Sequence, residues 1–358
     1  MSIPRSKTTS PMFLGQPRVQ LNTGIWMPQA AVGTGIDRAS PHGMPIGEMV
    51  TTALEAGYLH IDTAEVYPGF NKIGQVLSKY DRTSFFLTSK VDVTLRKRRR
   101  RCTTNGEGCF VVVQTATHSI LRTLGVTYVD LLLLHRPPAL TRSHSSRSIN
   151  STEAATIQCT QIQEQWRALE SALHAGQARA IGVSNYCFTC LQCLLERAKV
   201  VPSVLQQMHR VGMGDNPFGL IQWARNRGIV YMAYSVLGGA DGAFRKIASQ
   251  PAVIQVARAH GVSAAEVVIR WVGQQGIPFV VLSNTHRHLA SNLGLAGPME
   301  KARWSLTTDE VAQLSALRSP AGRPSYWGEC DDSEAVPSNG SHPVAIDRVD
   351  GHEPRRAM

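Results

Sequence analysis

The chain has 358 residues, of which 43% are hydrophobic and 18% are charged, and its formal net charge is +11. No apolar run approaches the roughly 18 residues of a membrane-spanning helix, and no apolar stretch near the N-terminus resembles a secretory signal, so we expect neither. Six of the positive charges lie in the run RKRRRR at 96–101, which has no aromatic residue among them. This favours a solvated loop over a surface for nucleic acid.

Apolar runs rich in β-branched residues recur along the chain, with helical patterns between them. The predicted strands are residues 29–33, 57–61, 84–89, 129–134, 179–183, 203–207, 229–234 and 278–282. Segments such as 47–57, 164–176 and 263–276 carry apolar residues three and four positions apart and end at a glycine, as amphipathic helices do. Eight strands alternating with helices predict an α/β fold, a (β/α)8 TIM barrel, although an open doubly wound sheet has the same strand pattern.

The predicted organisation is one domain with flexible ends. No G-x-G-x-x-G turn follows any of the strands, which argues against a Rossmann domain. We expect a flexible leader over residues 1–20, the barrel over 21–318 and a mobile tail over 319–358, which is rich in Pro, Gly, Ser and acidic residues. Residues 95–109 and 137–160 are polar and lack periodicity, so we expect them to be inserted loops.

The chain contains seven cysteines and no secretory signal, so we expect reduced thiols. Cys187, Cys190 and Cys193 form a C-x-x-C-x-x-C run, but a fourth ligand at matching spacing is missing. The run lies in an apolar segment, so these residues are interpreted as small buried helix residues rather than metal ligands.

Polar or ionisable residues stand at the ends of seven consecutive predicted strands. In chain order they are Asp62, Lys90, His135, Ser184 with Asn185, Gln206, Tyr234 and Ser283. The carboxyl ends of the strands form the face of a β/α barrel that carries active sites. One such residue is usually structural, for example a helix cap, but seven on one rim indicate a functional site.

Tyr67, in the loop five residues after Asp62, adds a phenol to this rim. A phenol is a poor acid at neutral pH because its pKa is about 10, and a neighbouring ammonium such as Lys90 lowers that pKa. The ammonium in turn needs a carboxylate partner, and a neutral imidazole at His135 can hold a carbonyl oxygen. These groups suit a reaction in which negative charge develops on oxygen, such as hydride transfer to a carbonyl.

Six motifs resemble the successive signatures of the aldo-keto reductases, in the family's order and over about residues 20–318. They are HIDTAEVY, LTSKV, VDLLLLHRP, IGVSNY, GIVYMAYSVLG and VLSNTHRHLASNL. The resemblance implies a β/α barrel that reduces an aldehyde or ketone to an alcohol with NADPH, NADH being possible. It also implies that Asp62, Tyr67 (the acid), Lys90 and His135 are catalytic.

Position by position, the resemblance also implies a cofactor site. Ser184, Asn185 and Gln206 would hold the nicotinamide carboxamide, Tyr234 would stack on the ring, and SNTHRHLASN would hold the adenosine 2′-phosphate at a helix start. The full set of implied cofactor-binding residues is Gly33, Thr34, Asp62, Ser184, Asn185, Gln206, Tyr234, Ser235, Leu237, Ser283, Asn284, Thr285, Arg287, His288 and Asn292.

The chain departs from the family's pattern at both ends of the site. Leu282 stands where the family often has Lys and His288 where it usually has Arg, so the preference for NADPH over NADH is open, although Arg287 and His286 can compensate. At the predicted substrate mouth, Gly35, Asp92 and Arg136 align with tryptophans of many members. They imply a wider and more polar mouth, unless Asp92 and Arg136 pair with each other and never meet substrate.

Two other functions are weighed. His60 and Asp62 lie two apart on a strand, as in a metal-dependent hydrolase barrel, but Lys90 and His135 do not complete a convincing ligand set. A non-catalytic NADP-binding barrel, acting as a redox sensor or a subunit, has no need of Lys90 and Tyr67 together. We therefore expect a monomeric, cytoplasmic enzyme that acts on a small carbonyl compound and binds no metal, membrane or nucleic acid.

Overall fold

The computed structural model describes residues 16–35, 44–94, 102–103, 105–138, 151–238, 243–283, 285–297 and 304–318. The basic run 96–101, the predicted tail, most of the predicted leader and Asn284 lie outside the described residues.

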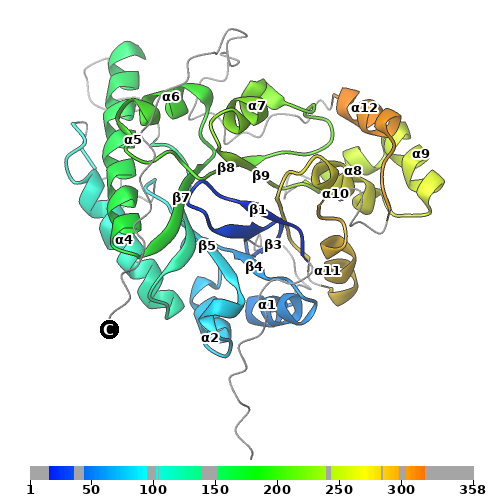
Figure 1. The fold of residues 1–358 in the computed structure, drawn as a ribbon, viewed down its shortest axis with the longest axis horizontal. Helices are drawn as coiled ribbons and strands as arrows, with labels where there is room; N and C mark the ends of the chain where they lie inside the picture. Colours follow the sequence, from blue (N-terminus) through cyan, green and yellow to red (C-terminus); the bar gives the residue numbers. More distant parts are fainter. Residues whose placement is uncertain are drawn as a thin grey trace, which may run out of the picture.

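Eight parallel strands close into a barrel in the order β10-β3-β4-β5-β6-β7-β8-β9, surrounded by helices (Figure 1). Closure is set by β10, in which Phe279 pairs with Ala30 of β3 on one side and with Ala233 of β9 on the other. The (β/α)8 prediction is confirmed and the open sheet is excluded. The strands are β3 Ala30–Gly33, β4 His60–Asp62, β5 Phe86–Val91, β6 Val129–Leu134, β7 Ala178–Ser184, β8 Val204–Met208, β9 Val230–Tyr234 and β10 Phe279–Val281.

Side chains alternate between two cores, as the pleat of a strand requires. In β6, Leu131 and Leu133 point into the barrel, whereas Leu132 and Leu134 pack outward against the helices. The helices are α1 Ile46–Glu55, α2 Phe70–Leu77, α4 Cys109–Leu124, α5 Ser151–His174, α6 Phe188–Arg197, α7 Leu220–Arg225, α8 Ala243–Ala248, α9 Pro251–His260, α10 Ala264–Gln274, α11 His286–Leu293 and α12 Thr308–Ala316, with 3-10 turns η1 Arg82–Ser84 and η2 Pro217–Gly219.

Within the described residues no single helix has the length and apolar character to cross a membrane; the pair α9 and α10 reaches both only when taken together, with a bend of 91° between them.

A hairpin that the sequence did not predict lies across one end of the barrel (Figure 1). Its strands, β1 Arg18–Gln20 and β2 Trp26–Pro28, have three residues each, too short to show a clear alternation. Met27 is fully buried in the same inner cluster as Leu131. The hairpin therefore contributes to the inner core, and it begins inside the segment that we assigned to the leader.

Residues 151–160, predicted as part of a loop, form the first turns of α5, so that prediction is wrong. Near the start of α5 the buried face carries glutamines in place of apolar residues, which hides the helical periodicity there. Gln158 donates to the carbonyl of Pro138 at 2.7 Å, and Gln161 donates to the carbonyl of Thr103 at 3.0 Å. These amides satisfy loop carbonyls that would otherwise be buried without partners.

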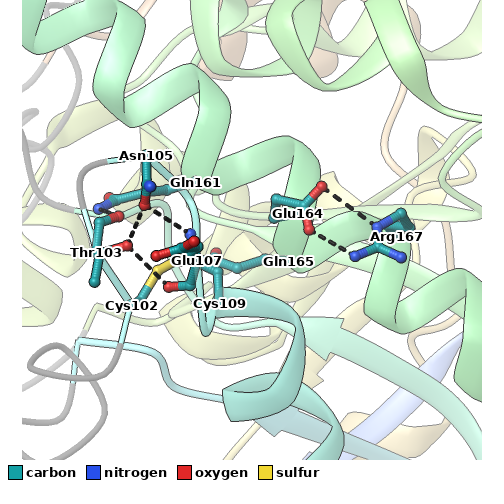
Figure 2. The surroundings of a disulfide bond; sticks show 9 residues. All are labelled: Cys102, Thr103, Asn105, Glu107, Cys109, Gln161, Glu164, Gln165 and Arg167. Atoms are coloured by element: carbon teal, nitrogen blue, oxygen red, sulfur yellow. Dashed lines mark hydrogen bonds and ion pairs between the residues drawn. A yellow bond between two sulfur atoms is a disulfide. The ribbon is translucent and has the colours of Figure 1, made fainter.

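The prediction of reduced thiols is wrong for five of the six described cysteines: four form two disulfides with one another, and Cys187 is disulfide-bonded as well. Cys102 bonds to Cys109 at the start of α4 (Figure 2), and Cys159 of α5 bonds to Cys193 of α6. The Cα atoms of these pairs are 4.3 Å and 5.6 Å apart, although 7 and 34 residues separate the cysteines along the chain. Cys190 is buried and takes part in no disulfide, and the described residues hold no cluster of His, Cys, Asp or Glu that could bind a metal.

Two buried histidines predict an acid-sensitive fold. His60 lies inside the barrel and His209 packs against Tyr231 and Trp271, at ring-centroid distances of 5.8 Å and 5.1 Å. Burial lowers the pKa of His60 to about 4 and that of His209 to about 3. Because the unfolded chain takes up these protons near pH 6.5, stability is complete above that pH and is lost as the pH falls towards 4 and 3.

We therefore expect urea unfolding to show a free energy of unfolding that decreases from pH 7 to pH 4, by an amount on the order of a few kcal/mol. His209→Phe should weaken this dependence and leave the part due to His60, because a phenyl ring takes up no proton in the unfolded state. An acid dependence of the same slope in His209→Phe and the wild type would contradict the assignment to His209.

Candidate active site

A buried ion pair forms the base of the site at the carboxyl ends of β4 and β5. Lys90 Nζ lies 2.5 Å from Asp62 Oδ1 and donates a second, longer hydrogen bond of 3.3 Å to the carbonyl of Thr63. The other oxygen of Asp62 accepts a hydrogen bond of 2.8 Å from Gln206 Nε2 of β8. Asp62, Lys90 and Gln206 are all buried, so both charges are compensated by protein groups rather than by water.

Tyr67 lies in the loop after β4, beside this ion pair. Its ring stands edge-on to that of His135, with centroids 5.6 Å apart and an interplanar angle of 80°. Lys90 Nζ is 5.3 Å from the centroid of the Tyr67 ring. Gly35 leaves room for this ring, because a Cβ at that position would lie 3.1 Å from Tyr67 Cζ. The fold thus gathers Asp62, Tyr67, Lys90 and His135 at one place.

The protonation states suit proton donation by Tyr67. Burial raises the pKa of Tyr67, and the charge and hydrogen bond of Lys90 oppose that rise. Burial alone would lower the pKa of Lys90, but its contacts with Asp62 and Tyr67 outweigh burial and leave the pKa raised. At neutral pH the site holds a phenol with its proton beside an ammonium ion. The ammonium acts in the predicted direction, but burial has the larger effect.

His135 follows β6 directly, and its backbone is held from two sides. Its N–H donates to the carbonyl of Val91 at 2.9 Å, and its carbonyl accepts from Asn185 Nδ2 at 2.8 Å. Burial lowers the pKa of His135, against the opposing effect of Asp92. The imidazole is therefore neutral at neutral pH, as expected from the sequence.

Asp92 and Arg136, expected at the substrate mouth, contact each other. Arg136 Nε is 3.4 Å from Asp92 Oδ2, and His135 Nδ1 is 3.3 Å from the same oxygen. Asp92 is buried, whereas the Arg136 side chain keeps 34% of its surface exposed. Asp92 thus faces inward, as in the alternative that the sequence left open, and Arg136 is the partly exposed member of the pair.

Buried Asp92 remains charged. Burial by itself would raise the pKa of its carboxyl, but hydrogen bonds from His135 and Thr94 and the charge of Arg136 hold that pKa well below its usual range.

The residues expected to hold the nicotinamide lie on β7, β8 and β9, next to the catalytic groups. The Tyr234 hydroxyl donates to Asn185 Oδ1 at 2.5 Å, and Asn185 Nδ2 also contacts Ser184 Oγ at 3.2 Å. Asn185 and Ser235 have φ values of 62° and 51°, in the left-handed region that non-glycine residues rarely adopt. Strain of this kind clusters at ligand sites, where the surrounding structure maintains it.

The segment expected to hold the 2′-phosphate forms the start of α11. Thr285 is the N-cap, and its side chain makes no capping hydrogen bond, so backbone N–H groups of the first turn are available to an anion. The first turn contains no acidic residue, and His286, Arg287 and His288 in it are exposed.

The other residues of the expected set have visible packing roles. A Cβ on Gly33 would lie 2.7 Å from Val280 Cγ1, so the approach of β3 to β10 requires glycine there. Thr34 Oγ1 donates to Thr63 Oγ1 at 2.9 Å, Leu237 packs against the outer core, and Ser283 and Asn292 are buried. Their cofactor contacts stay predictions.

This donor set fits a nicotinamide dinucleotide. Amide and hydroxyl side chains stand beside the partly exposed ring of Tyr234, which suits a planar ring that bears a carboxamide. A cationic first helical turn suits the phosphate at the opposite end. The residues present therefore match the group that the motifs imply.

Sequence reasoning missed the residues that hold Asp92 in place. Thr94 donates to Asp92 Oδ1 through both its backbone N–H, at 2.9 Å, and its Oγ1, at 2.6 Å. Glu65 Oε1 accepts from the Asp92 N–H at 2.8 Å. The D-x-T spacing of Asp92 and Thr94 is a known local turn signal and was available in the sequence.

Comparison with known proteins identifies a family. A model described as "Aldo/keto reductase family" matches residues 46–318. Aldo-keto reductase family 1 member A1 of Cricetulus griseus is 28% identical over 343 residues, which cover 91% of this chain and 97% of that protein. Aldo-keto reductase family 4 member C11 of Arabidopsis thaliana is 30% identical over 313 residues, covering 83% and 88%.

Solved structures are similar as well. An aldo-keto reductase of Bombyx mori, in complex with NADP, superposes with a TM-score of 0.67 at 26% identity, covering 84% of this chain and 92% of that one. The aldose reductase of Schistosoma japonicum superposes with a TM-score of 0.65 at 22% identity, covering 91% and 100%, which supports the fold.

Proposed function

The chain belongs to the aldo/keto reductase family, and from this premise we propose that it reduces an aldehyde or ketone to an alcohol with NADPH, with Tyr67 as the proton donor. The observation that carries the proposal is the cluster of Asp62, Tyr67, Lys90 and His135. Two strands, one loop and the residue that follows β6 bring a phenol, an ammonium, a carboxylate and an imidazole together.

Each catalytic group has one task. Tyr67 gives its proton to the carbonyl oxygen, and the Lys90 ammonium stabilises the phenolate that remains. Asp62 keeps Lys90 charged and in place, and His135 orients the oxygen when its Nε2 carries a proton. When bound, the reduced nicotinamide supplies the hydride; Ser184, Asn185, Gln206 and Tyr234 would hold it.

Binding titrations test the cofactor assignment independently of turnover. NADPH and NADH should each quench tryptophan fluorescence, and NADPH should bind more tightly if the first turn of α11 holds the 2′-phosphate. Arg287→Ala should weaken NADPH binding by about tenfold or more, since a charge-assisted hydrogen bond contributes roughly 1.5–3 kcal/mol, and should leave NADH binding nearly unchanged. Arg122→Ala, on an exposed residue in the last turn of α4, is the matched control.

If Arg287→Ala lost affinity for NADPH and for NADH by the same factor, a phosphate contact at Arg287 would be contradicted.

His288→Arg should strengthen the binding of NADPH and leave that of NADH unchanged. A guanidinium is charged at every relevant pH and binds phosphate through two hydrogen bonds.

The substrate is a small carbonyl compound, and Arg136 is a partly exposed charged side chain next to His135 that could meet it. A panel of aldehydes, ketones and sugars, followed by loss of nicotinamide absorbance, identifies the class. The presence of Arg136 favours substrates that carry a negative charge. The monomeric state and the cytoplasmic location stay predictions from the sequence.

The alternatives fit less well. A metal at His60 and Asp62 lacks free ligands, because the His60 nitrogens contact the carbonyl of Pro28 at 3.1 Å and Thr88 Oγ1 at 2.8 Å, and both Asp62 oxygens are engaged. A non-catalytic barrel does not account for the buried Lys90 beside Tyr67, since an unused buried charge only costs stability.

A further inference from the structure

The two ring nitrogens of His135 have different surroundings. Its Nδ1 is buried, makes no hydrogen bond of ordinary geometry, and has Asp92 Oδ2 as its neighbour at 3.3 Å. With Nδ1 buried, the opposite edge of the ring, which carries Nε2, is the edge available to a substrate. The described residues place no hydrogen-bond partner against Nε2.

Asp92 can act on Nδ1 because its own orientation is fixed. Thr94 donates twice to Oδ1, and Glu65 accepts from the Asp92 backbone N–H. These contacts leave Oδ2 directed at His135 Nδ1 and Arg136 Nε. A carboxylate only accepts hydrogen bonds, so the imidazole nitrogen that faces it carries the proton.

We propose that Asp92 is a positioning residue that holds neutral His135 in the Nδ1–H form, so that Nε2 accepts a hydrogen bond from an alcohol but must be protonated before it can donate to a carbonyl oxygen. The tautomer is inferred from the approach of the Asp92 carboxylate to Nδ1, whereas its consequence for turnover rests on the proposed function. A tryptophan in place of Asp92, as in many family members, could not impose this form.

The charged and titratable groups around His135 come from several elements. Asp92 after β5 favours the imidazolium, whereas Lys90 of β5 and the adjacent Arg136 disfavour it. Tyr67, from the loop after β4, contacts the ring edge-on, and β7 contributes the neutral Asn185. Because burial and the two cations together exceed the effect of Asp92, the imidazolium is a minor species at neutral pH.

The two directions of the reaction should therefore differ in their pH dependence. Carbonyl reduction needs a donor at Nε2, so its kcat/KM should fall by about tenfold per pH unit above the pKa of His135. Oxidation of the alcohol needs an acceptor at Nε2 and should not fall over the same range.

Asp92→Asn should invert the tautomer. Because Thr94 donates twice to Oδ1, the carbonyl oxygen of the asparagine keeps that place and its amide N–H turns towards His135. Nδ1 then becomes the acceptor and Nε2 carries the proton. Neutral His135 can now donate to a carbonyl, so the pH dependence of reduction between pH 6 and 8 should become flat.

The direct test is 15N NMR of histidine-labelled protein without cofactor or substrate, with His135→Gln to identify the signals among the 12 histidines. We expect neutral His135 as Nδ1–H in the wild type and in Arg136→Met, which keeps Asp92, and as Nε2–H in Asp92→Asn. An Nε2–H signal for wild-type His135 would overturn the proposal, whether or not the variants fold.

Kinetics in both directions complete the test. If the tautomers are as expected but Asp92→Asn keeps the wild-type pH profile, the claimed consequence for turnover is wrong. If the NMR result holds and the wild type reduces no carbonyl compound, the proposed function fails while the role of Asp92 in setting the tautomer stands.

Discussion

Tyr67→Phe should lower kcat/KM for carbonyl reduction by about 10²–10⁴-fold, because it removes the proton donor from the site. The substitution deletes one oxygen and keeps the ring that packs against Gly35 and His135. The free energy of unfolding and the affinity for NADPH should therefore change little. Steady-state kinetics, urea unfolding and fluorescence titration of the same preparation measure the three quantities.

A matched control removes a different phenol oxygen. Tyr58 is buried in the outer core, and its hydroxyl has no hydrogen-bond partner among the described residues. Tyr58→Phe should leave turnover at the wild-type level. Normal turnover in Tyr67→Phe would exclude Tyr67 as the acid, and a large loss in Tyr58→Phe would show that the assay reports folding rather than chemistry.

Lys90→Met should abolish turnover and also lower the free energy of unfolding by about 3–5 kcal/mol, because it leaves the buried Asp62 carboxylate without its cation. Gln206 still donates to Asp62 but brings no charge. Lys72→Met, at an exposed position of α2, is the control and should change neither quantity. Urea unfolding and steady-state kinetics of each variant provide the two measurements.

The double variant Asp62→Asn with Lys90→Met separates the two effects. Asparagine can still accept from Gln206 and carries no charge, so much of the lost stability should return. Turnover should stay absent, because the ammonium that stabilises the Tyr67 phenolate is missing. A double variant no more stable than Lys90→Met would show that the unpaired charge is not the cause of the instability.

Much of the fold could be predicted because the signals are local. A run such as VDLLLL in β6 is almost wholly apolar, which indicates a strand of a parallel sheet that is covered on both faces. The start of α5 escaped prediction because glutamines form its buried face, and burial of an amide depends on loop carbonyls elsewhere in the chain. The hairpin escaped because three-residue strands have too little pattern.

The sequence by itself determined the alternation of strands and helices and the polar residues at the strand ends, since both are written in consecutive residues. Only the tertiary structure decided the rest: closure through β10, the disulfides, and the inward turn of Asp92 towards His135. These features depend on how closely segments distant along the chain approach one another. A difference of a few ångströms between such segments decides whether the Asp92 carboxylate contacts a substrate or the His135 imidazole. The order of the residues along the chain does not give these distances.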